Sequence, residues 1–126
     1  MRLRGDGPVG QRSRLVYKLV VFVPVDEAEA VKQALFDAGA GGYDRYDSCS
    51  WQTQGIGQFR PLRGSAPYLG TEGTVERVAE LRIEMVCRDE MVRAAIDALR
   101  AAHPYEEPAY EVYQIFTAGE LPPGLP

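Results

Sequence analysis

The chain has 126 residues, of which 45% are hydrophobic and 25% are charged, and its formal net charge is −4 at pH 7. This length and composition fit one globular domain with a core of its own. No apolar run is long enough to span a membrane, so we expect no membrane partner. Four arginines lie among the first fourteen residues, which leaves the remainder strongly acidic. An acidic body repels phosphate backbones, which argues against nucleic acid as a partner.

The two ends of the chain lack any apolar periodicity. Residues 1–14 predict a disordered tail and residues 119–126 a flexible C-terminal tail, with the folded domain between them at 15–118. The leader has no apolar segment of the kind found in secretory signals, so we expect a cytoplasmic protein. We also hypothesise that the native chain begins at Val16 rather than Met1, because a GTG start codon read internally gives valine. Cys49 and Cys87 are expected to be buried thiols rather than a disulfide.

The first half of the domain predicts a strand, a helix and a second strand. Residues 17–25 are almost continuously apolar, as in a central strand. Asp26 and Glu29 have the spacing of a capping box, and the helical apolar period that follows stops at Gly39. Residues 47–54 have the composition of a strand, and Gly55-Ile56-Gly57 predicts a turn or bulge that leads into a hairpin-like extension.

The second half repeats the pattern after a loop over residues 63–74. Strict alternation of apolar and charged residues from Val75 predicts a half-buried strand. Asp89 is the expected N-cap of a second helix, which ends before Pro104, and residues 109–116 form the last strand.

The resulting order, βαββαβ, predicts an α+β ferredoxin-like sandwich, in which one four-stranded sheet carries both helices on one face. The other face would remain uncovered and partly apolar. An apolar face left to solvent is unusual in a monomer, so we expect a homo-oligomer.

Three motifs support a more specific assignment. They are the run from Cys49 to Pro61, the loop Gly70-Thr71-Glu72-Gly73 with Val75-Glu76-Arg77-Val78, and His103-Pro104-Tyr105-Glu106-Glu107-Pro108. Over residues 17–115 the sequence resembles the PII/CutA-like insert of dinuclear-metal proteins in the family named for NGG-interacting factor three. The resemblance implies a free-standing form of this insert and a trimer, as in PII and CutA. In the full-length family the metal ligands lie in the two halves that flank this insert. The resemblance therefore does not imply an enzymatic activity for this chain.

The run from His103 to Tyr110 is the strongest candidate for a site, because it concentrates polar chemistry at a helix–strand junction. His103 has two alternative roles: it caps the helix C-terminus, or it binds a divalent cation together with Glu107 and Cys49. Glu106 and Glu107 are neighbours and therefore do not face each other as an acid–base pair. Either carboxylate could instead accept backbone N–H groups or pair with Arg60 or Arg82. No nucleophile is paired with a base, so enzymatic activity is not expected.

We therefore expect a small trimeric binding or regulatory module that binds a small ligand or a divalent cation at clefts between subunits and acts through a protein partner. The predicted ligand-binding residues are Trp51, Gln52, Arg60, Tyr105, Glu106, Glu107 and Tyr110. A structural or interaction module without a ligand is the alternative, and a metal-dependent hydrolase is a weaker one.

Overall fold

The computed structural model describes residues 15–124, so the N-terminal tail expected at residues 1–14 lies outside the described residues. The strands are β1 (Val16–Pro24), β2 (Trp51–Phe59), β3 (Glu76–Arg88) and β4 (Tyr110–Ile115). The α-helices are α1 (Ala28–Asp37) and α2 (Asp89–Ala102), and 3-10 turns occur at Val25–Glu27 and Ala118–Glu120. The predicted element order is confirmed. Within the described residues, no helix is long and apolar enough to cross a membrane.

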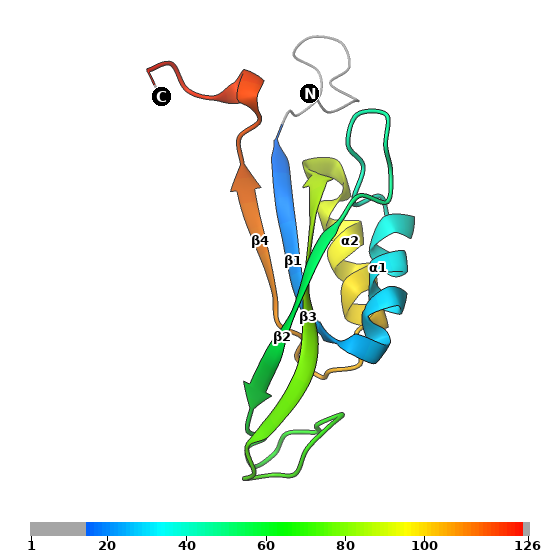
Figure 1. The fold of residues 1–126 in the computed structure, drawn as a ribbon, viewed down its shortest axis with the longest axis vertical. Coiled ribbons are helices and arrows are strands. Elements are labelled where there is room, and N and C mark those ends of the chain that lie inside the picture. The colour runs from blue at the N-terminus through cyan, green and yellow to red at the C-terminus, as the bar shows by residue number, and fades with distance from the viewer. Residues whose placement is uncertain (1–14, 125–126) are drawn as a thin grey trace.

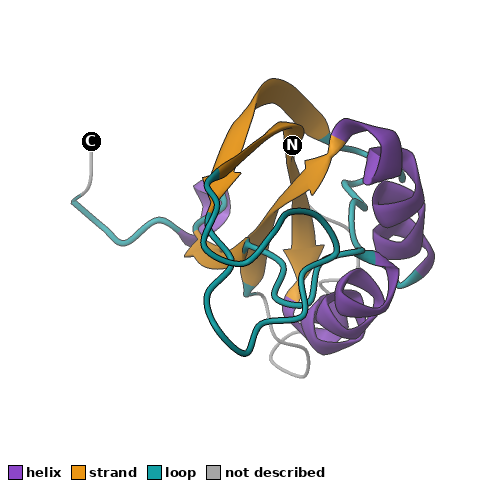
Figure 2. Ribbon diagram, turned by 90° about the horizontal axis from the view of Figure 1, so that it is seen from below, coloured by secondary structure: helices purple, strands orange, loops and turns teal. Residues whose placement is uncertain are grey.

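The four strands form one antiparallel sheet in the order β2-β3-β1-β4, and both helices cover the same face of it (Figures 1 and 2). The core lies between the two layers and includes Leu19, Val21 and Ile83 from the sheet and Leu35 and Leu99 from the helices. Alternate apolar residues of β1 and β3 point to the helices, because side chains along a strand alternate between faces. The predicted ferredoxin-like fold is therefore confirmed.

The path of β2 differs from the prediction. The strand begins at Trp51 rather than residue 47 and continues through both glycines without a turn or bulge. Gly55 pairs with Glu80, and Gly57 pairs with Val78, in an uninterrupted register. A glycine in a strand can allow a neighbouring side chain to approach closely, and a glycine in a turn looks the same in the local sequence. The sequence therefore could not tell these two roles apart.

Both predicted helix caps are also wrong. Asp26 lies in the 3-10 turn before α1, and the N-cap of α1 is Glu27, which makes no side-chain capping bond. Asp89 is the first residue of α2 rather than its N-cap, which is Arg88. Neither helix start has a side-chain capping bond, so both starts depend on tertiary packing more than on a local cap.

The two cysteines differ in burial. Cys87 is a buried free thiol as predicted, and burial raises the pKa of this thiol to about 11. Cys49 is only half-buried and lies in the segment before β2 rather than inside a strand. Its backbone N–H donates to Gly41 O, near the end of the sheet where β1 begins.

The uncovered sheet face carries mixed charged and aromatic side chains. Period-two alternation places Lys18 and Phe22 of β1 on this face, and their β3 neighbours Arg82 and Glu84 share it. Glu84 lies 3.3 Å from Lys18 Nζ and accepts a 2.9 Å hydrogen bond from Arg82 Nε. Burial opposes ionisation of Glu84, but the bonds from Arg82 and Lys18 hold its pKa below the usual value.

The β2–β3 hairpin is longer than the rest of the sheet. β1 ends at Pro24, opposite Glu80, whereas β3 already begins at Glu76. The loop over residues 60–75 closes this extension at the lower end of the molecule, below the segment that connects α2 to β4 (Figure 1). Three segments far apart in sequence therefore meet at one end of the sheet.

Candidate functional site

A pocket of about 660 Å³ lies at this lower end of the sheet. Its wall is formed by residues 53–59 of β2, by part of the 60–75 loop and by the segment after α2. The aromatic lining residues are Phe22, Phe59, Tyr68 and Tyr105. The charged lining residues are Glu80, Arg82, Glu106 and Glu107. A concave, largely apolar cavity with a few polar groups is typical of a small-molecule site.

Tyr105 connects the three walls of the pocket. Its hydroxyl donates a 3.1 Å hydrogen bond to Glu80 Oε2 on β3. Its ring lies 5.7 Å from that of Phe59 on β2 and 6.3 Å from that of Tyr68 in the loop, in tilted arrangements favoured between aromatic rings. Burial, followed by the nearby carboxylate of Glu80, raises the pKa of Tyr105 well above its usual value. The phenol therefore remains a neutral donor at physiological pH.

Buried His103 fixes the backbone at Tyr105. It is only 5% exposed, and its Nδ1 accepts a 3.1 Å hydrogen bond from the backbone N–H of Tyr105. Nε2 lies 2.7 Å from the carbonyl oxygen of Phe22. These contacts assign the neutral tautomer with hydrogen on Nε2, because Nδ1 accepts from an N–H group while Nε2 faces a carbonyl oxygen, which can only accept. His103 therefore links the segment after α2 to β1.

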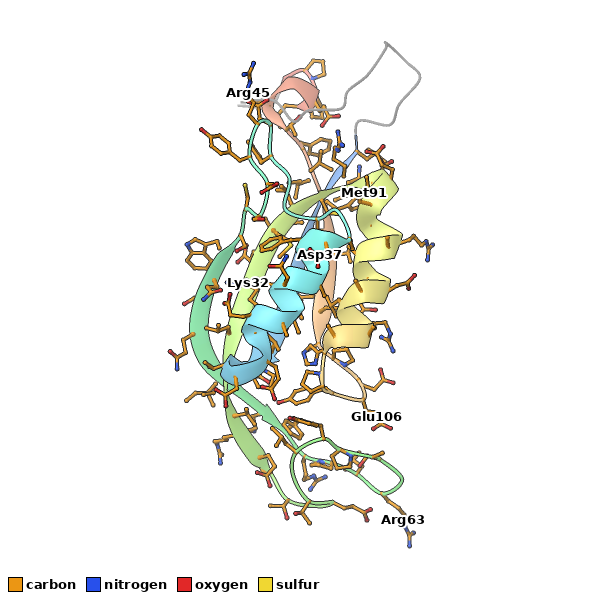
Figure 3. The ribbon with its side chains drawn as sticks, turned by 90° about the vertical axis from the view of Figure 1, so that its right-hand side faces the viewer. Lys32, Asp37, Arg45, Arg63, Met91 and Glu106 are labelled. Carbon is orange, nitrogen blue, oxygen red and sulfur yellow. The ribbon has the colours of Figure 1, made fainter. Side chains whose placement is uncertain are left out.

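The 60–75 loop is bound by two carboxylates, Glu106 of the pocket lining and Glu27 before α1. Tyr68 Oη donates to Glu27 Oε1 at 2.9 Å, and the backbone N–H of Ala66 donates to Glu106 Oε1 at 3.1 Å. Figure 3 shows Glu106 pointing from the segment after α2 toward the loop that carries Arg63. The hydrogen bond from Tyr68 to Glu27 raises the pKa of Tyr68. The loop is thus held over the pocket mainly by polar contacts.

The structure brings part of the predicted ligand set together. Tyr105, Glu106 and Glu107 line the pocket beside residues 53–59, and the lining comes from a single chain, whereas the expected clefts lie between subunits. Trp51, Gln52, Arg60 and Tyr110 are outside the lining. Trp51 is 61% exposed, and Tyr110 instead packs against the core.

The predicted metal set is not brought together. Cys49 lies near the start of β1, whereas His103 contacts Phe22 near its end, roughly 13 Å further along the strand at its usual rise. Both ring nitrogens of His103 are engaged in protein contacts. Within residues 15–124, no group of three or more His, Cys, Asp or Glu side chains is placed to hold a metal ion. The imidazole therefore makes structural contacts with β1 and Tyr105, whereas the predicted capping of the helix C-terminus is made only by the backbone N–H of His103, which donates to Leu99 O.

Sequence reasoning missed Glu80, Phe22 and Tyr68 as pocket residues. Glu80 belongs to the alternating charges of β3, which predict a solvated face, and Phe22 belongs to an apolar strand. Tyr68 is one aromatic residue in a glycine- and proline-rich loop. The available signal was the pair of glycines in β2, because Gly57 leaves space that the Glu80 carboxylate fills.

The fold defines the class of the domain, an α+β ferredoxin-like domain of the PII/CutA type. CutA from Archaeoglobus fulgidus, described as a periplasmic divalent cation tolerance protein, aligns with a TM-score of 0.59 at 19% identity. The alignment covers 82% of this chain and 86% of CutA. Bacillus subtilis GlnK aligns with a TM-score of 0.54 at 16% identity, over 80% of this chain and 85% of GlnK. At these identities the likeness shows the fold alone.

Sequence similarity gives a closer relationship. A Mycobacterium leprae protein named GTP cyclohydrolase 1 type 2 homolog is 44% identical over 107 residues, 85% of this chain and 27% of the relative. Its Mycobacterium tuberculosis counterpart is 47% identical over 98 residues, 78% of this chain and 26% of the relative. A Bacillus cereus protein related to NIF3 aligns with a TM-score of 0.72 at 44% identity, over 84% of this chain and 27% of that protein. No protein-family model matches the sequence.

The chain is therefore homologous to one segment of the NIF3-related proteins, which confirms the resemblance predicted from its motifs. It spans about a quarter of the length of these relatives.

Proposed function

We propose that this chain is a small-ligand-binding module whose ligand occupies the pocket beside Tyr105. The observation that carries the proposal is the pocket itself, formed where residues 53–59 of β2 and the segment after α2 lie beside Glu80 of β3. Its volume of about 660 Å³ is within the ordinary range of small-molecule sites. Ligand binding would fix the 60–75 loop, whose surface could then report occupancy to a protein partner.

A homo-oligomer is part of the proposal. Trp51 on the uncovered face and Ile56 on the edge strand are 61% and 77% exposed, which supports burial against a second copy. The resemblance to PII and CutA favours a trimer. These same exposed residues also support the alternative of a purely structural or interaction module, in which a neighbouring subunit fills the pocket.

A divalent cation as the sole ligand receives less support, because Cys49 lies far from His103 and residues 15–124 hold no group of three metal-ligating side chains. The cyclohydrolase activity in the names of the relatives is likewise not supported by the residues of this pocket. Tyr105 remains a neutral phenol, and His103 is buried with both ring nitrogens in hydrogen bonds to the backbone.

The test uses benzamide as a neutral, flat probe and follows backbone amide resonances of the full chain. A probe this small binds with a dissociation constant on the order of a millimolar. We expect saturable shifts at Phe59, Ala66 and Tyr105. In the variant Ala109→Trp, an indole at the pocket wall should abolish them, whereas Ala101→Trp on exposed α2 should not. Shifts that spread over the surface without saturation, or that persist in Ala109→Trp, would contradict the proposal.

A further inference from the structure

The charge balance of the pocket is negative. Its charged lining residues are Arg82 and three glutamates. Arg82 donates to Glu84 Oε2 at 2.9 Å, outside the lining, and its guanidinium stands over the Phe22 ring at 5.7 Å from the centroid. Arg82 shares Glu84 with Lys18, so its positive charge is only partly offset. The three carboxylates of the pocket wall nevertheless outnumber this single cation, and the lining keeps an excess of negative charge.

Each of these carboxylates retains acceptor capacity. Glu80 uses Oε2 for the Tyr105 hydroxyl, and Glu106 uses Oε1 for the backbone N–H of Ala66. Within residues 15–124, Glu107 makes no hydrogen bond or ion pair, and it is exposed at the pocket wall. An ionised carboxylate accepts through two oxygens, so all three can bond a further N–H donor.

The other part of the lining favours a flat ligand with a positive charge. The rings of Phe59 and Tyr68 each pack against Tyr105 at a tilt, so that three aromatic rings cluster on the pocket wall. Faces of aromatic rings attract cations and stack on flat apolar groups, whereas they disfavour anions. Aromatic faces and carboxylates thus select for the same sign of charge.

An inorganic cation fits this arrangement poorly. A hard divalent ion needs several oxygen or nitrogen ligands at short range, and the described residues provide no such group. An organic cation is less strongly hydrated and can place its apolar body against the aromatic surface.

We infer that the pocket takes a small organic cation, a flat apolar body carrying an amidinium-like or ammonium group. This inference deepens the proposed function and depends on it. The cationic N–H groups would contact Glu107 and the two carboxylate oxygens that make no hydrogen bond within the protein, Glu80 Oε1 and Glu106 Oε2. The flat body would lie against Tyr105 and Phe59.

The experiment compares benzamidine, benzamide and benzoate, which share one flat shape and differ in charge at pH 7. Each is titrated into the full chain at low ionic strength, with the amide shifts of Phe59, Ala66 and Tyr105 as the readout. We expect benzamidine to bind about tenfold more tightly than benzamide, with benzoate the weakest. Added salt should reduce the preference for benzamidine, because screening weakens exposed charge pairs.

Two variants separate local charge from the overall acidity of the chain. Glu107→Gln should weaken benzamidine about two- to fivefold and leave benzamide unchanged. Glu72→Gln makes the same charge change in the 60–75 loop but outside the lining, so it should leave both unchanged. Equal losses in the two variants would overturn the inference.

The outcomes distinguish this inference from the proposed function. Saturable pocket shifts of equal affinity for all three probes, or a preference for benzoate, would overturn the inference and leave the proposed function standing. Pocket shifts produced by Zn²⁺ alone, at lower concentration than by benzamidine, would also overturn it in favour of an inorganic cation. Absence of saturable pocket shifts with every probe would overturn both.

Discussion

The carboxylate of Glu80 occupies the space that a Cβ atom on Gly57 would take. The two residues are diagonal neighbours across the β2–β3 pair, since Glu80 is directly opposite Gly55. Because Gly57 has no side chain, Glu80 can lie flat across β2 and still accept the hydrogen bond from Tyr105. One glycine thus determines where a carboxylate of the pocket lies.

Gly57→Ala is expected to displace this carboxylate and break its bond to Tyr105. We expect a loss of about 1 to 2 kcal/mol in the free energy of unfolding, because a new methyl group overlaps a hydrogen-bonded side chain. Gly55→Ala is the matched control, since nothing lies within 4 Å of a Cβ at that position. It should be neutral or stabilising by up to about 1 kcal/mol. Urea unfolding of both variants measures the difference, and equal effects would contradict the role assigned to Gly57.

Tyr105→Phe should cost about 1 kcal/mol through the lost hydrogen bond to Glu80. It should also change the dependence of stability on pH. The folded-state pKa of Tyr105 is raised above its unfolded value, so its stabilising contribution is complete below about pH 10 and is lost as pH rises toward the folded-state pKa. Thermal melts between neutral and alkaline pH should therefore show a smaller alkaline loss in Tyr105→Phe than in the parent chain. Parallel curves would show that Tyr105 is not coupled to the pocket carboxylates.

The element order and the helix lengths were predictable because they follow from local patterns. The apolar run of β1, the alternation in β3 and the helical period before Pro104 each reflect packing on one side of one element. Burial of Leu19, Ile83 and Leu99 in a common core is the direct consequence.

The pocket was only half predictable, because its contacts connect residues distant in sequence. The run from His103 to Tyr110 was identified by its composition, and it does supply Tyr105, Glu106 and Glu107. Its partners are specified by register and loop path. The glycines of β2 predict a turn until Glu80 is known to lie across Gly57, and no local signal places the 60–75 loop beside Glu106.

His103→Ala tests the structural role of the buried imidazole. The substitution removes both the bond to Phe22 O and the acceptor for Tyr105 N–H, so we expect a loss of about 2 to 3 kcal/mol. His103→Gln can restore one of these contacts and should lose less. Calorimetric titration with Zn²⁺ should give the same result for the parent chain and the Gln variant. Loss of Zn²⁺ binding in a folded Gln variant would instead assign His103 to a metal site.

The oligomer prediction concerns the uncovered sheet face. Sedimentation of the 13.9 kDa chain at micromolar concentration should give a species of about three times that mass. Trp51→Glu places a charge on this face and should shift the assembly toward monomers. Tyr46→Glu, at another exposed aromatic residue outside the sheet, should leave the assembly intact. A parent chain that sediments as a monomer would contradict the prediction.

Glu107→Gln distinguishes a ligand pocket from a structural clasp. Because Glu107 is exposed and unpaired within residues 15–124, removing its charge should change the free energy of unfolding by less than about 0.5 kcal/mol. A slight gain is expected, since the variant relieves repulsion from the neighbouring carboxylates of Glu80 and Glu106. Glu106→Gln should lose more stability than Glu107→Gln, because Glu106 accepts the hydrogen bond that holds the loop at Ala66. Urea unfolding of the two variants gives their order. A loss above about 1 kcal/mol for Glu107→Gln would identify this carboxylate as part of the fold rather than of the pocket.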